Sequence, residues 1–394
     1  MKKFNFQKQF KNKKILITGH TGFKGSWLTC WLVLLGAKVM VLSINIPTYP
    51  SHFKAIKLQK KINHKRIDIR NLKLLKITFK KYQPDYVFHL AAQAIVKKSY
   101  SDPTYTWETN TIGTLNVLEA LRDINKKCIA VIITSDKSYK NLEIKRGYKE
   151  NDILGGKDPY SASKASAELA IQSHIRSFFP LKKTKVLVGI ARAGNVIGGG
   201  DWSENRLIPD CVKSWSKNQK VLLRNPNSTR PWQHVLEAVW GYLLLALTLK
   251  KNKKLHGEAF NFGPENTKDY NVIFLVKLMK KYWKEISWKM PNKKKKNFYE
   301  SNLLKLNSNK AKTKLKWKCI LTFGETIHMV TNWYKSYYSK PKKIQQVSLN
   351  QINEYEKLLK KGRFNESKKK RSRYSFLDNR TSRFGQIEHF EKYF

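Results

Sequence analysis

The sequence predicts an α/β protein with a doubly wound parallel sheet, and three observations support this fold class. Short apolar runs without polar alternation recur along the chain, as expected for parallel strands buried on both faces. Segments with helical periodicity lie between them, most clearly at 109–122 and 161–177. A glycine-rich turn joins the first apolar run to a helix, which makes a βαβ unit. Together these features predict a Rossmann-type fold.

The elements follow in order from this pattern. A strand is expected at 14–18, a helix at 26–35 that ends at Gly36, and a second strand at 39–42. Further strands are expected at 86–90, 129–133, 186–190 and 259–262, and helices at 272–281 and 323–338. Three regions are predicted: a dinucleotide-binding domain (1–190 with 231–268), a smaller substrate-binding domain that covers the sheet (191–230 with 269–360) and a basic tail (361–394).

Composition excludes several classes of protein. The 394 residues include 78 Lys and Arg against 28 Asp and Glu, a formal net charge of +50. The lysines are spread along the whole chain, which favours a solvated surface that attracts anions over a nucleic-acid site. Four distant cysteines predict neither a disulfide framework nor a zinc site, and no apolar run reaches the ~18–20 residues that cross a membrane. We expect a cytoplasmic protein without metal, membrane or nucleic acid as partners.

The glycine turn predicts a dinucleotide site. Gly19, Gly22 and Gly25 follow a buried strand and open a helix, where a diphosphate can approach the backbone at the helix N-terminus. The residue that should bind the adenosine ribose, at the end of the second strand, is Asn45 instead of an acidic residue. NAD is the expected cofactor, with NADP left open by this neutral side chain. Asp68 is either an adenine contact or a solvated loop carboxylate.

A second constellation predicts proton transfer. Tyr160 and Lys164 are four residues apart and share a helix face, so the ammonium can lower the pKa of the phenol and prepare it as a base. They follow a strand that ends in Thr134-Ser135-Asp136-Lys137. The alternative for Asp136 and Lys137 is an ion pair on a surface loop.

Five ordered stretches carry a resemblance to a known family. The chain resembles the extended short-chain dehydrogenase/reductases, and among them the nucleotide-sugar 4,6-dehydratases that use CDP-sugars. Lys137 stands where the dTDP-type enzymes of this family have Glu. The matching stretches are Gly19 to Leu28, Thr134 to Lys137, Asp158 to Lys164, Ala191 to Trp202, and Arg224 to Val235.

This resemblance implies a lyase reaction with NAD on CDP-glucose or a related nucleotide sugar. Tyr160 would take the proton of the 4-hydroxyl, with Lys164 holding the cofactor ribose, while Ser135 or Thr134 polarises the 4-oxygen. Asp136 would protonate the departing 6-hydroxyl. Lys137 would act as the C5 base or stabilise the enolate. The family also implies a homodimer or higher homo-oligomer, with the helices at 109–122 and 161–177 as the candidate interface.

Further binding residues are implied by the same resemblance. Asn110 should help to position the catalytic helix, and His234 is expected to pack or hydrogen-bond instead of binding a metal. Cofactor contacts are expected from Phe23, Ile69, Leu90, Ala91, Ala92 and Asn110, in addition to the glycines, Asn45, Asp68, Tyr160 and Lys164; substrate contacts are expected from Gln93, Asn195, Arg206, Arg224, Arg230 and His234.

Two alternatives remain. A nucleotide-sugar 4-epimerase shares the cofactor turn and the Tyr160–Lys164 pair, but it lacks an acid at the elimination site, so Asp136 and Lys137 favour a dehydratase. A basic nucleic-acid-binding protein on a vestigial fold is the other alternative, and the retention of all these residues together argues against it.

Overall fold

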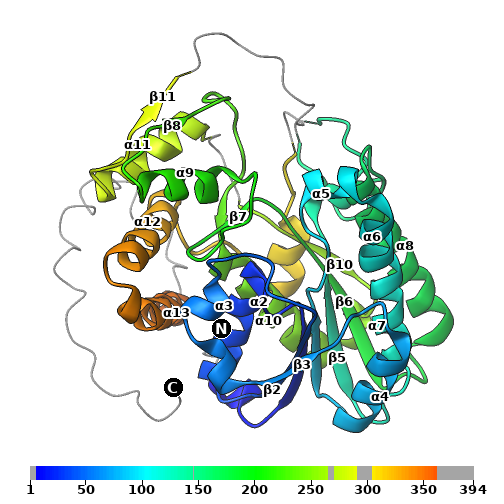
Figure 1. Ribbon diagram of the computed structural model, residues 1–394. Helices are drawn as coiled ribbons and strands as arrows, with labels where there is room; N and C mark the ends of the chain where they lie inside the picture. Colours follow the sequence, from blue (N-terminus) through cyan, green and yellow to red (C-terminus); the bar gives the residue numbers. More distant parts are fainter. Residues whose placement is uncertain (1–5, 145, 265–269, 291–303, 362–394) are drawn as a thin grey trace.

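The computed structural model describes residues 6–144, 146–264, 270–290 and 304–361, and in this part of the chain seven parallel strands form the main sheet (Figure 1). Their order is β10-β6-β5-β4-β1-β2-β3. Because β1 lies between β4 and β2, the chain reverses its direction across the sheet there, and a ligand crevice is expected at this point. The predicted doubly wound parallel sheet is confirmed. The strands are β1 (Lys14–Thr18), β2 (Lys38–Ser43), β3 (Asn63–Arg66), β4 (Tyr86–His89), β5 (Cys128–Ile133), β6 (Val186–Ala193) and β10 (Ala259–Phe262).

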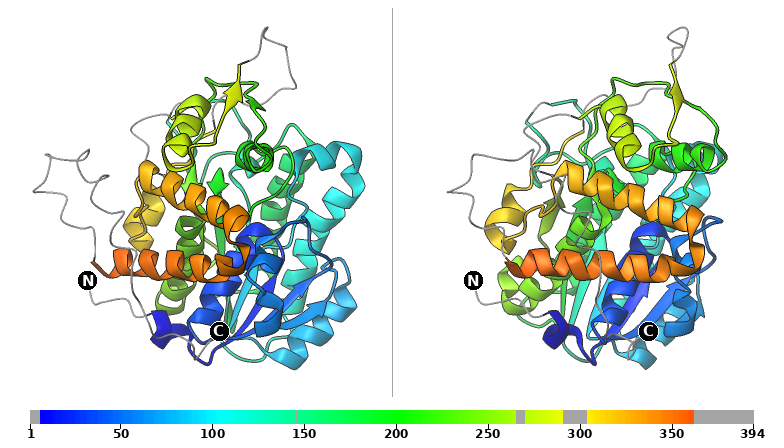
Figure 2. Two further views of the ribbon diagram at one scale, coloured as in Figure 1. Left: turned by 60° about the vertical axis from the view of Figure 1, so that its left-hand side comes forward. Right: turned by 90° about the vertical axis from the view of Figure 1, so that its left-hand side faces the viewer.

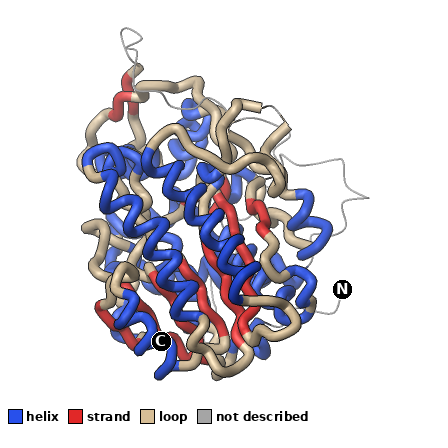
Figure 3. The backbone as a smooth tube through the Cα atoms, turned by 90° about the vertical axis from the view of Figure 1, so that its right-hand side faces the viewer, coloured by secondary structure: helices blue, strands red, loops and turns tan. Residues whose placement is uncertain are grey.

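Helices cover both faces of the sheet, which explains the unbroken apolar runs of the strands. In β1, Ile15 and Ile17 pack into one core, and Leu16 packs into the other. One face is covered by α2 (Phe23–Leu34) and α10 (Val235–Lys251). The opposite face, turned to the viewer in Figure 3, is covered by α4 (Leu72–Tyr82), α7 (Gly113–Leu121) and α8 (Pro159–Phe178).

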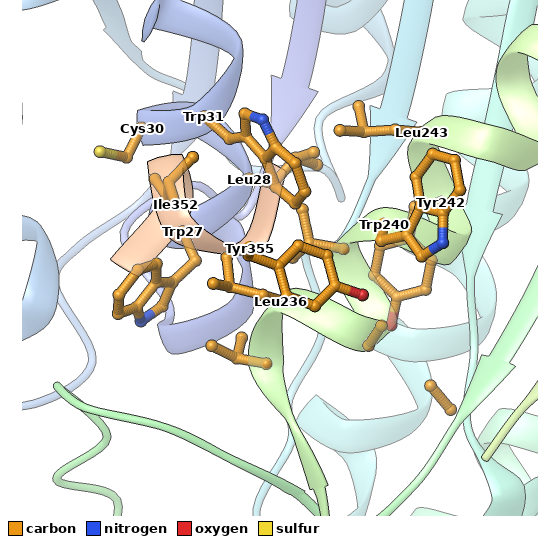
Figure 4. Packing of buried hydrophobic residues seen from close by; sticks show 14 of the residues in the cluster. Trp27, Leu28, Cys30, Trp31, Leu236, Trp240, Tyr242, Leu243, Ile352 and Tyr355 are labelled. Carbon is orange, nitrogen blue, oxygen red and sulfur yellow. The ribbon is translucent and has the colours of Figure 1, made fainter. Parts of the chain in front are cut away.

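The helix α13 (Ile344–Lys361) packs on the helices of the sheet, although its residues fall in the predicted substrate domain. Figure 4 shows Ile352 and Tyr355 of α13 among side chains of α2 and α10. The rings of Trp31 and Tyr355 meet edge to face with centroids 5.7 Å apart. The Tyr355 hydroxyl donates to the buried Glu237 on α10 at 2.6 Å. Polar and aromatic contacts therefore join the two parts of the chain.

A smaller group of elements lies above one end of the sheet (Figure 2). It contains α9 (Leu207–Trp215), α11 (Val272–Tyr282) and α12 (Phe323–Ser339), with the short pair β8 (Val221–Leu222) and β11 (Trp288–Lys289). A second short pair, β7 (Val196–Ile197) and β9 (Gln233–His234), leads from the sheet into this group. Trp202 packs against Trp333 and Tyr337 here, so it is part of the core.

The remaining helical segments are short. They are α1 (Phe6–Phe10), α3 (His52–Ala55), α5 (Val96–Ser101), α6 (Pro103–Trp107), 3-10 turns at Leu58–Lys61, Asp136–Ser138, Lys253–Leu255 and Pro341–Lys343, and π-helical turns at Glu108–Ile112 and Ala311–Leu315. In the described ranges, no helix combines the length and the apolar character that a membrane span needs. The predicted tail beyond Lys361 lies outside the described residues.

The structure differs from the predicted elements in several places. The helix predicted at 109–122 begins with the π-helical turn Glu108–Ile112 before α7. The sequence prediction did not include β3, α4, α10 or α13. Helix α10 is buried almost all round, so its apolar residues show no amphipathic period. The edge strand β3 has the polar sequence Asn-His-Lys-Arg, which carries no strand signal.

Candidate active site

The glycine turn between β1 and α2 is packed too closely for side chains at two of its glycines. Gly19 has a φ of +76°, and a β-carbon there would lie 2.5 Å from the Ala91 backbone nitrogen. A β-carbon at Gly25 would lie 2.2 Å from the Gly19 carbonyl oxygen. At Gly22 the nearest atom is 3.4 Å away, so this side of the turn is open in front of the α2 N-terminus. This cradle fits the diphosphate of a dinucleotide.

Helix α8 presents Tyr160 and Lys164 on one buried face. The helix begins with a capping box formed by Asp158 and Ser161. Asn110 donates to the Ser163 hydroxyl at 2.9 Å, so the predicted contact between Asn110 and the catalytic helix is present. Burial raises the pKa of Tyr160, and a side-chain hydrogen bond with Ser135 acts in the opposite direction.

Lys164 has a strongly perturbed pKa. Burial and, to a smaller extent, the charge of Lys24 lower the pKa of Lys164 to about 7, while Glu168 opposes this shift. A lysine with this pKa changes its charge near neutral pH, which is unusual for a structural lysine. Its ammonium form can stabilise the Tyr160 phenolate.

The loop after β5 brings Ser135 and Asp136 to Tyr160. The Ser135 hydroxyl donates to Asp136 Oδ1 at 3.0 Å, and the Asn195 amide donates to Asp136 Oδ2 at 3.4 Å. Asp136 is 5% exposed, so it does not form the surface ion pair that was the alternative. Lys137 is partly buried, and its backbone N–H donates to the Ser135 hydroxyl oxygen at 3.2 Å.

Thr134 faces away from the base, towards the buried interior. Its hydroxyl donates to Glu168 Oε1 at 2.6 Å, which uses its single proton. Of the two predicted alternatives for polarising the 4-oxygen, Ser135 is therefore the residue next to Tyr160.

Lys24 is a site residue that the sequence prediction missed. It lies inside the glycine turn and interacts electrostatically with Arg206, Asp136 and Asp201. Burial and the charge of Arg206 lower its pKa to about 8, although the two carboxylates act against this shift. The sequence signal was available: a charged residue between Gly22 and Gly25, in a turn that packs closely against the sheet, is forced towards the ligand crevice.

The three arginines predicted for the substrate diphosphate have different surroundings. Arg206 donates to Asp201 Oδ2 at 2.7 Å and interacts electrostatically with Tyr160, which places it at the site. Arg224 is exposed and interacts electrostatically with Asp210 of α9. Arg230 is partly buried, and its Nη1 donates to the carbonyl oxygen of its neighbour in sequence at 2.8 Å.

Several of the residues predicted to contact the cofactor lie at or just after the carboxyl ends of β1, β2 and β4. Leu90 donates its backbone N–H to the Thr18 carbonyl at 3.1 Å, and Ala91 donates to the Thr18 hydroxyl at 3.2 Å; Ala92 follows, partly buried. Phe23 begins α2. The Asn45 side chain is exposed, and its backbone oxygen accepts a hydrogen bond from the Thr21 hydroxyl at 2.7 Å.

Asp68 and Ile69 lie in the loop after β3. Asp68 accepts hydrogen bonds from Arg70, which hold its pKa below the usual range although burial alone would raise it. Ile69 is buried, and a β-carbon at Gly113 would lie 2.6 Å from its Cδ1.

Two predicted substrate contacts are structural instead. His234 has no exposed surface and lies edge to face with Trp27 at 6.3 Å, because β9 carries it into the core. Burial lowers its pKa to about 3, so it is neutral. Gln93 is buried, and its amide donates to the Thr106 hydroxyl at 2.9 Å while its oxygen accepts from the Ile95 N–H at 2.6 Å. The side chains of both residues are thus buried and make their contacts inside the protein.

Metal-ligand groups and cavities add little to the description of this site. The described residues contain no group of three His, Cys, Asp or Glu side chains that could hold a metal ion. A cavity of about 320 Å³ lies elsewhere, beside Arg192, Glu150 and Lys310 near the β10 edge of the sheet. The candidate site is recognised instead by the side chains that come together there, chiefly Tyr160, Asp136 and Lys24.

Comparison with known proteins identifies the family. The family model described as GDP-mannose 4,6 dehydratase matches residues 16–330. The chain belongs to this family. It is also 41% identical over 332 residues to the CDP-glucose 4,6-dehydratase of Salmonella typhimurium, covering 83% of this chain and 92% of that enzyme. The predicted membership of the extended short-chain dehydrogenase/reductases is thus confirmed.

Solved structures of this dehydratase and epimerase family share the fold. An epimerase from Methanothermobacter thermautotrophicus superposes with a TM-score of 0.72 at 24% identity, over 86% of this chain and 96% of that chain. The UDP-glucuronic acid 4-epimerase from Bacillus cereus, solved with UDP-glucuronic acid and NAD, gives a TM-score of 0.68 at 20% identity, over 82% of this chain and all of that chain (100%).

Proposed function

We propose that this chain is an NAD-dependent CDP-glucose 4,6-dehydratase that forms CDP-4-dehydro-6-deoxyglucose and water. The observation that carries the proposal is the buried Asp136, which is hydrogen-bonded to Ser135 and lies with it close enough to Tyr160 for both to affect the pKa of its phenol. A 4-epimerase needs the base but no acid for elimination, so this arrangement favours a dehydratase. The 41% identity to the Salmonella enzyme of that name supports the same substrate.

The glycine turn and Lys164 would hold NAD⁺. At Gly22 a β-carbon would make only an ordinary contact, and we propose that the diphosphate lies there. Lys164, on the same helix as Tyr160, is proposed to bind the nicotinamide ribose. When bound, NAD⁺ supplies the acceptor for the C4 hydrogen as hydride and returns it at C6. NAD is proposed over NADP, because Asn45 can bind a ribose hydroxyl but brings no positive charge for a phosphate.

Tyr160 is the proposed base of the first step. Its phenolate takes the proton of the sugar 4-hydroxyl, and the Ser135 hydroxyl, which donates to Asp136 in the structure, is proposed to turn to the 4-oxygen and polarise it. Burial raises the pKa of this phenol, so it needs help to ionise. The ammonium of Lys164 provides that help by attraction to the phenolate, with the Ser135 hydrogen bond acting in the same direction.

Asp136 is the proposed acid of the elimination. Once C4 is a ketone, the C5 proton is acidic and the 6-hydroxyl can leave as water when Asp136 donates a proton to it. Lys137 is proposed to take the C5 proton when neutral, or to stabilise the enolate when charged. Gly194 and Asn195 hold Asp136 from the other side.

The arginines are proposed to bind the diphosphate of the substrate. Guanidinium groups match phosphate oxygens through paired hydrogen bonds, and Arg206 is already at the site through Asp201. We propose that segments 191–230 and 269–360, which include Arg206, Arg224 and Arg230, form the substrate-binding part of the chain. The cytosine base remains a prediction from the family resemblance, and a cytoplasmic location remains a prediction from the composition of the sequence.

A homodimer through α7 and α8 is also proposed. Four large apolar side chains are exposed along α6 to α8: Trp107 at 38%, Ile112 at 47%, Leu169 at 57% and Phe178 at 47%. Such a row on one helical layer is typical of a protein interface. Light scattering should give twice the chain mass, and Leu169→Glu should shift the protein to monomer; a monomeric wild type contradicts this proposal.

The decisive experiment is a substrate panel. Purified protein with NAD⁺ is incubated with CDP-, dTDP-, GDP- and UDP-glucose, and products are detected by mass. We expect CDP-glucose to lose one water and to give the alkali-induced ultraviolet absorption of a 4-keto-6-deoxy sugar. An epimerised sugar without mass loss supports the epimerase alternative. Salt-dependent binding of polyanions without any turnover supports the nucleic-acid alternative.

A further inference from the structure

Glu168 is a fully buried carboxylate on the catalytic helix that the proposed mechanism does not use. It lies four residues after Lys164 and eight after Tyr160, so all three occupy one face of α8. Its Oε1 accepts a hydrogen bond from the Thr134 hydroxyl at 2.6 Å. The Ser138 hydroxyl lies 3.2 Å from the same oxygen, and it also donates to the Ser135 carbonyl at 2.7 Å.

These two hydroxyls lie on either side of the reacting part of the loop. Thr134 precedes Ser135 and Asp136, and Ser138 follows Lys137, so the segment that carries the proposed acid is hydrogen-bonded to the carboxylate at its start and lies beside it at its end. That carboxylate stands on the helix that carries the proposed base. The separation between acid and base is therefore fixed through Glu168, although the two come from different parts of the chain.

The charge of Glu168 is balanced on its other side by Arg192 of β6. The Arg192 Nε donates to Oε1 at 2.7 Å, and its Nη2 donates to Oε2. The remaining Nη1 donates to the Tyr139 hydroxyl at 2.6 Å and to the Glu150 carbonyl at 3.0 Å. Well-packed hydrophobic side chains often stabilise a core as much as a buried ion pair does. The Glu168–Arg192 pair therefore matters more for the position in which it holds the carboxylate than for its contribution to stability.

Glu168 also acts on Lys164. Lys164 interacts electrostatically with Lys24 from α2, with His89 from β4 and with Glu168 from its own helix. Tyr160 is buried on α8 one turn before Lys164. Lys24 disfavours the ammonium form, and burial keeps His89 neutral by lowering its pKa to about 3. Glu168 is the negative charge in this set that favours the ammonium form.

We infer that Glu168 is a positioning residue: it holds the acid-bearing loop 134–138 at a fixed distance from Tyr160 and, one turn after Lys164 on the same face of α8, favours the ammonium form of Lys164. The inference deepens the proposed function and rests on it for the first role. The second role is a property of the folded protein alone. Two independent measurements therefore test it.

The loop role is tested with Thr134→Val, which removes the hydrogen bond to Glu168 and leaves in place both the charge of Glu168 and the hydrogen bond from Ser138 to the Ser135 carbonyl. Using C4-deuterated CDP-glucose in single turnovers, we expect C4 oxidation to stay within about twofold of wild type while elimination slows about tenfold or more, because misplacement of a catalytic group by ~1 Å is costly. Equal rates for both steps in the variant and the wild type would overturn the loop role.

The charge role is tested with Glu168→Gln, which keeps the shape of the side chain. Without the negative charge Lys164 should lose its proton at lower pH, so the alkaline limb of the C4-oxidation rate should move down by about one pH unit. Glu258→Gln, on an exposed carboxylate paired with Lys310, is the matched control and should leave the limb in place. An unmoved limb in Glu168→Gln would overturn the charge role.

A readout without substrate separates this inference from the proposed function. Lys164→Met is made in the wild-type and Glu168→Gln backgrounds, and the pH dependence of unfolding is compared. Coupling between the two substitutions supports the charge role even if no nucleotide sugar is turned over; additive effects at every pH contradict it. If Glu168→Gln does not fold because Arg192 is left unpaired, the cycle is carried out with Glu168→Gln/Arg192→Gln as the background.

Discussion

The carboxylate of Asp136 occupies the space that a side chain at position 194 would need. A β-carbon on Gly194 would lie 1.8 Å from Asp136 Oδ2 and 2.0 Å from its Cγ. The glycine at the end of β6 thus allows the proposed acid to lie against the backbone of a neighbouring strand, with Asn195 beside it. Glycine at position 194, just after β6, therefore makes room for Asp136, which follows β5.

Gly194→Ala should therefore damage elimination specifically. The added methyl group must displace the Asp136 carboxylate, so we expect water loss to slow about a hundredfold. C4 oxidation, which depends on Tyr160, should persist in single turnovers. The matched control is Gly324→Ala, because no atom lies within 4 Å of a β-carbon there. It should leave both steps unchanged, and a normal elimination rate in Gly194→Ala would show that Asp136 does not need this position.

Tyr160→Phe should abolish the first step. The variant keeps the ring but cannot take the 4-hydroxyl proton, so turnover should fall about a thousandfold. No near-ultraviolet absorbance of NADH should form when CDP-glucose is mixed with the NAD⁺-loaded protein. Detectable NADH at the wild-type rate would remove Tyr160 from its proposed role.

Asp136→Asn should block the reaction later than Tyr160→Phe does. An amide cannot donate an acidic proton to the departing 6-hydroxyl, so elimination should slow about a hundredfold. Deuterium should still move from C4 to the cofactor, since Ser135 and Tyr160 are intact. If C4 oxidation is lost to the same extent as elimination, Asp136 acts in the first step instead.

Lys164 should make stability increase with pH. Its folded-state pKa of about 7 is below the ordinary value of 10.5, so the unfolded chain binds more protons between these two pH values. The wild type should gain up to about 4 kcal/mol of unfolding free energy relative to Lys164→Met from pH 7 to pH 10. Urea denaturation across this range measures the difference. Lys97→Met, at an exposed position on α5, is the control, and its free energy of unfolding should depend on pH in the same way as that of the wild type.

Glu237 should make the stability of the folded protein decrease as the pH rises, the opposite of the effect of Lys164. Burial raises its pKa to about 7, although the Ile320 and Leu321 N–H groups and Tyr355 donate to it. Because the pKa is raised in the folded protein, protonated Glu237 stabilises the folded state fully below about pH 4.5, and this stabilisation is lost as the pH rises through 7.

Glu237→Gln should remove this loss. The variant should gain about 3 kcal/mol relative to wild type between pH 4.5 and pH 8. If the free energy of unfolding depends on pH in the same way for both proteins across this range, Glu237 ionises as easily in the folded protein as in the unfolded chain, and the prediction is wrong.

The strands and the glycine turn were predictable because their signal is local. Buried parallel strands need continuous apolar side chains, and Gly19 needs a positive φ at a tight turn; both requirements are written in a few neighbouring residues. Helix α10 was not predictable by period, because a helix buried all round shows no amphipathic pattern. The polar edge strand β3 was missed for the related reason that it takes its conformation from β2.

The candidate site divides in the same way. Tyr160 and Lys164 are one helical turn apart, so their meeting follows from the sequence spacing alone. The burial of His234, the commitment of Thr134 to Glu168, and the presence of Lys24 at the site do not, because each depends on which face another element covers.

The sequence by itself determined six of the seven strands of the sheet, the glycine turn, and the pairing of Tyr160 with Lys164 on one helix. Only the tertiary structure decided which hydroxyl faces the base, how closely Asp136 lies against Gly194, and that Glu168 joins the two halves of the site. The physical reason is range: backbone conformation and helical spacing act over a few residues, whereas burial, hydrogen-bond partners and pKa values are set by residues that are distant in the chain and adjacent in space.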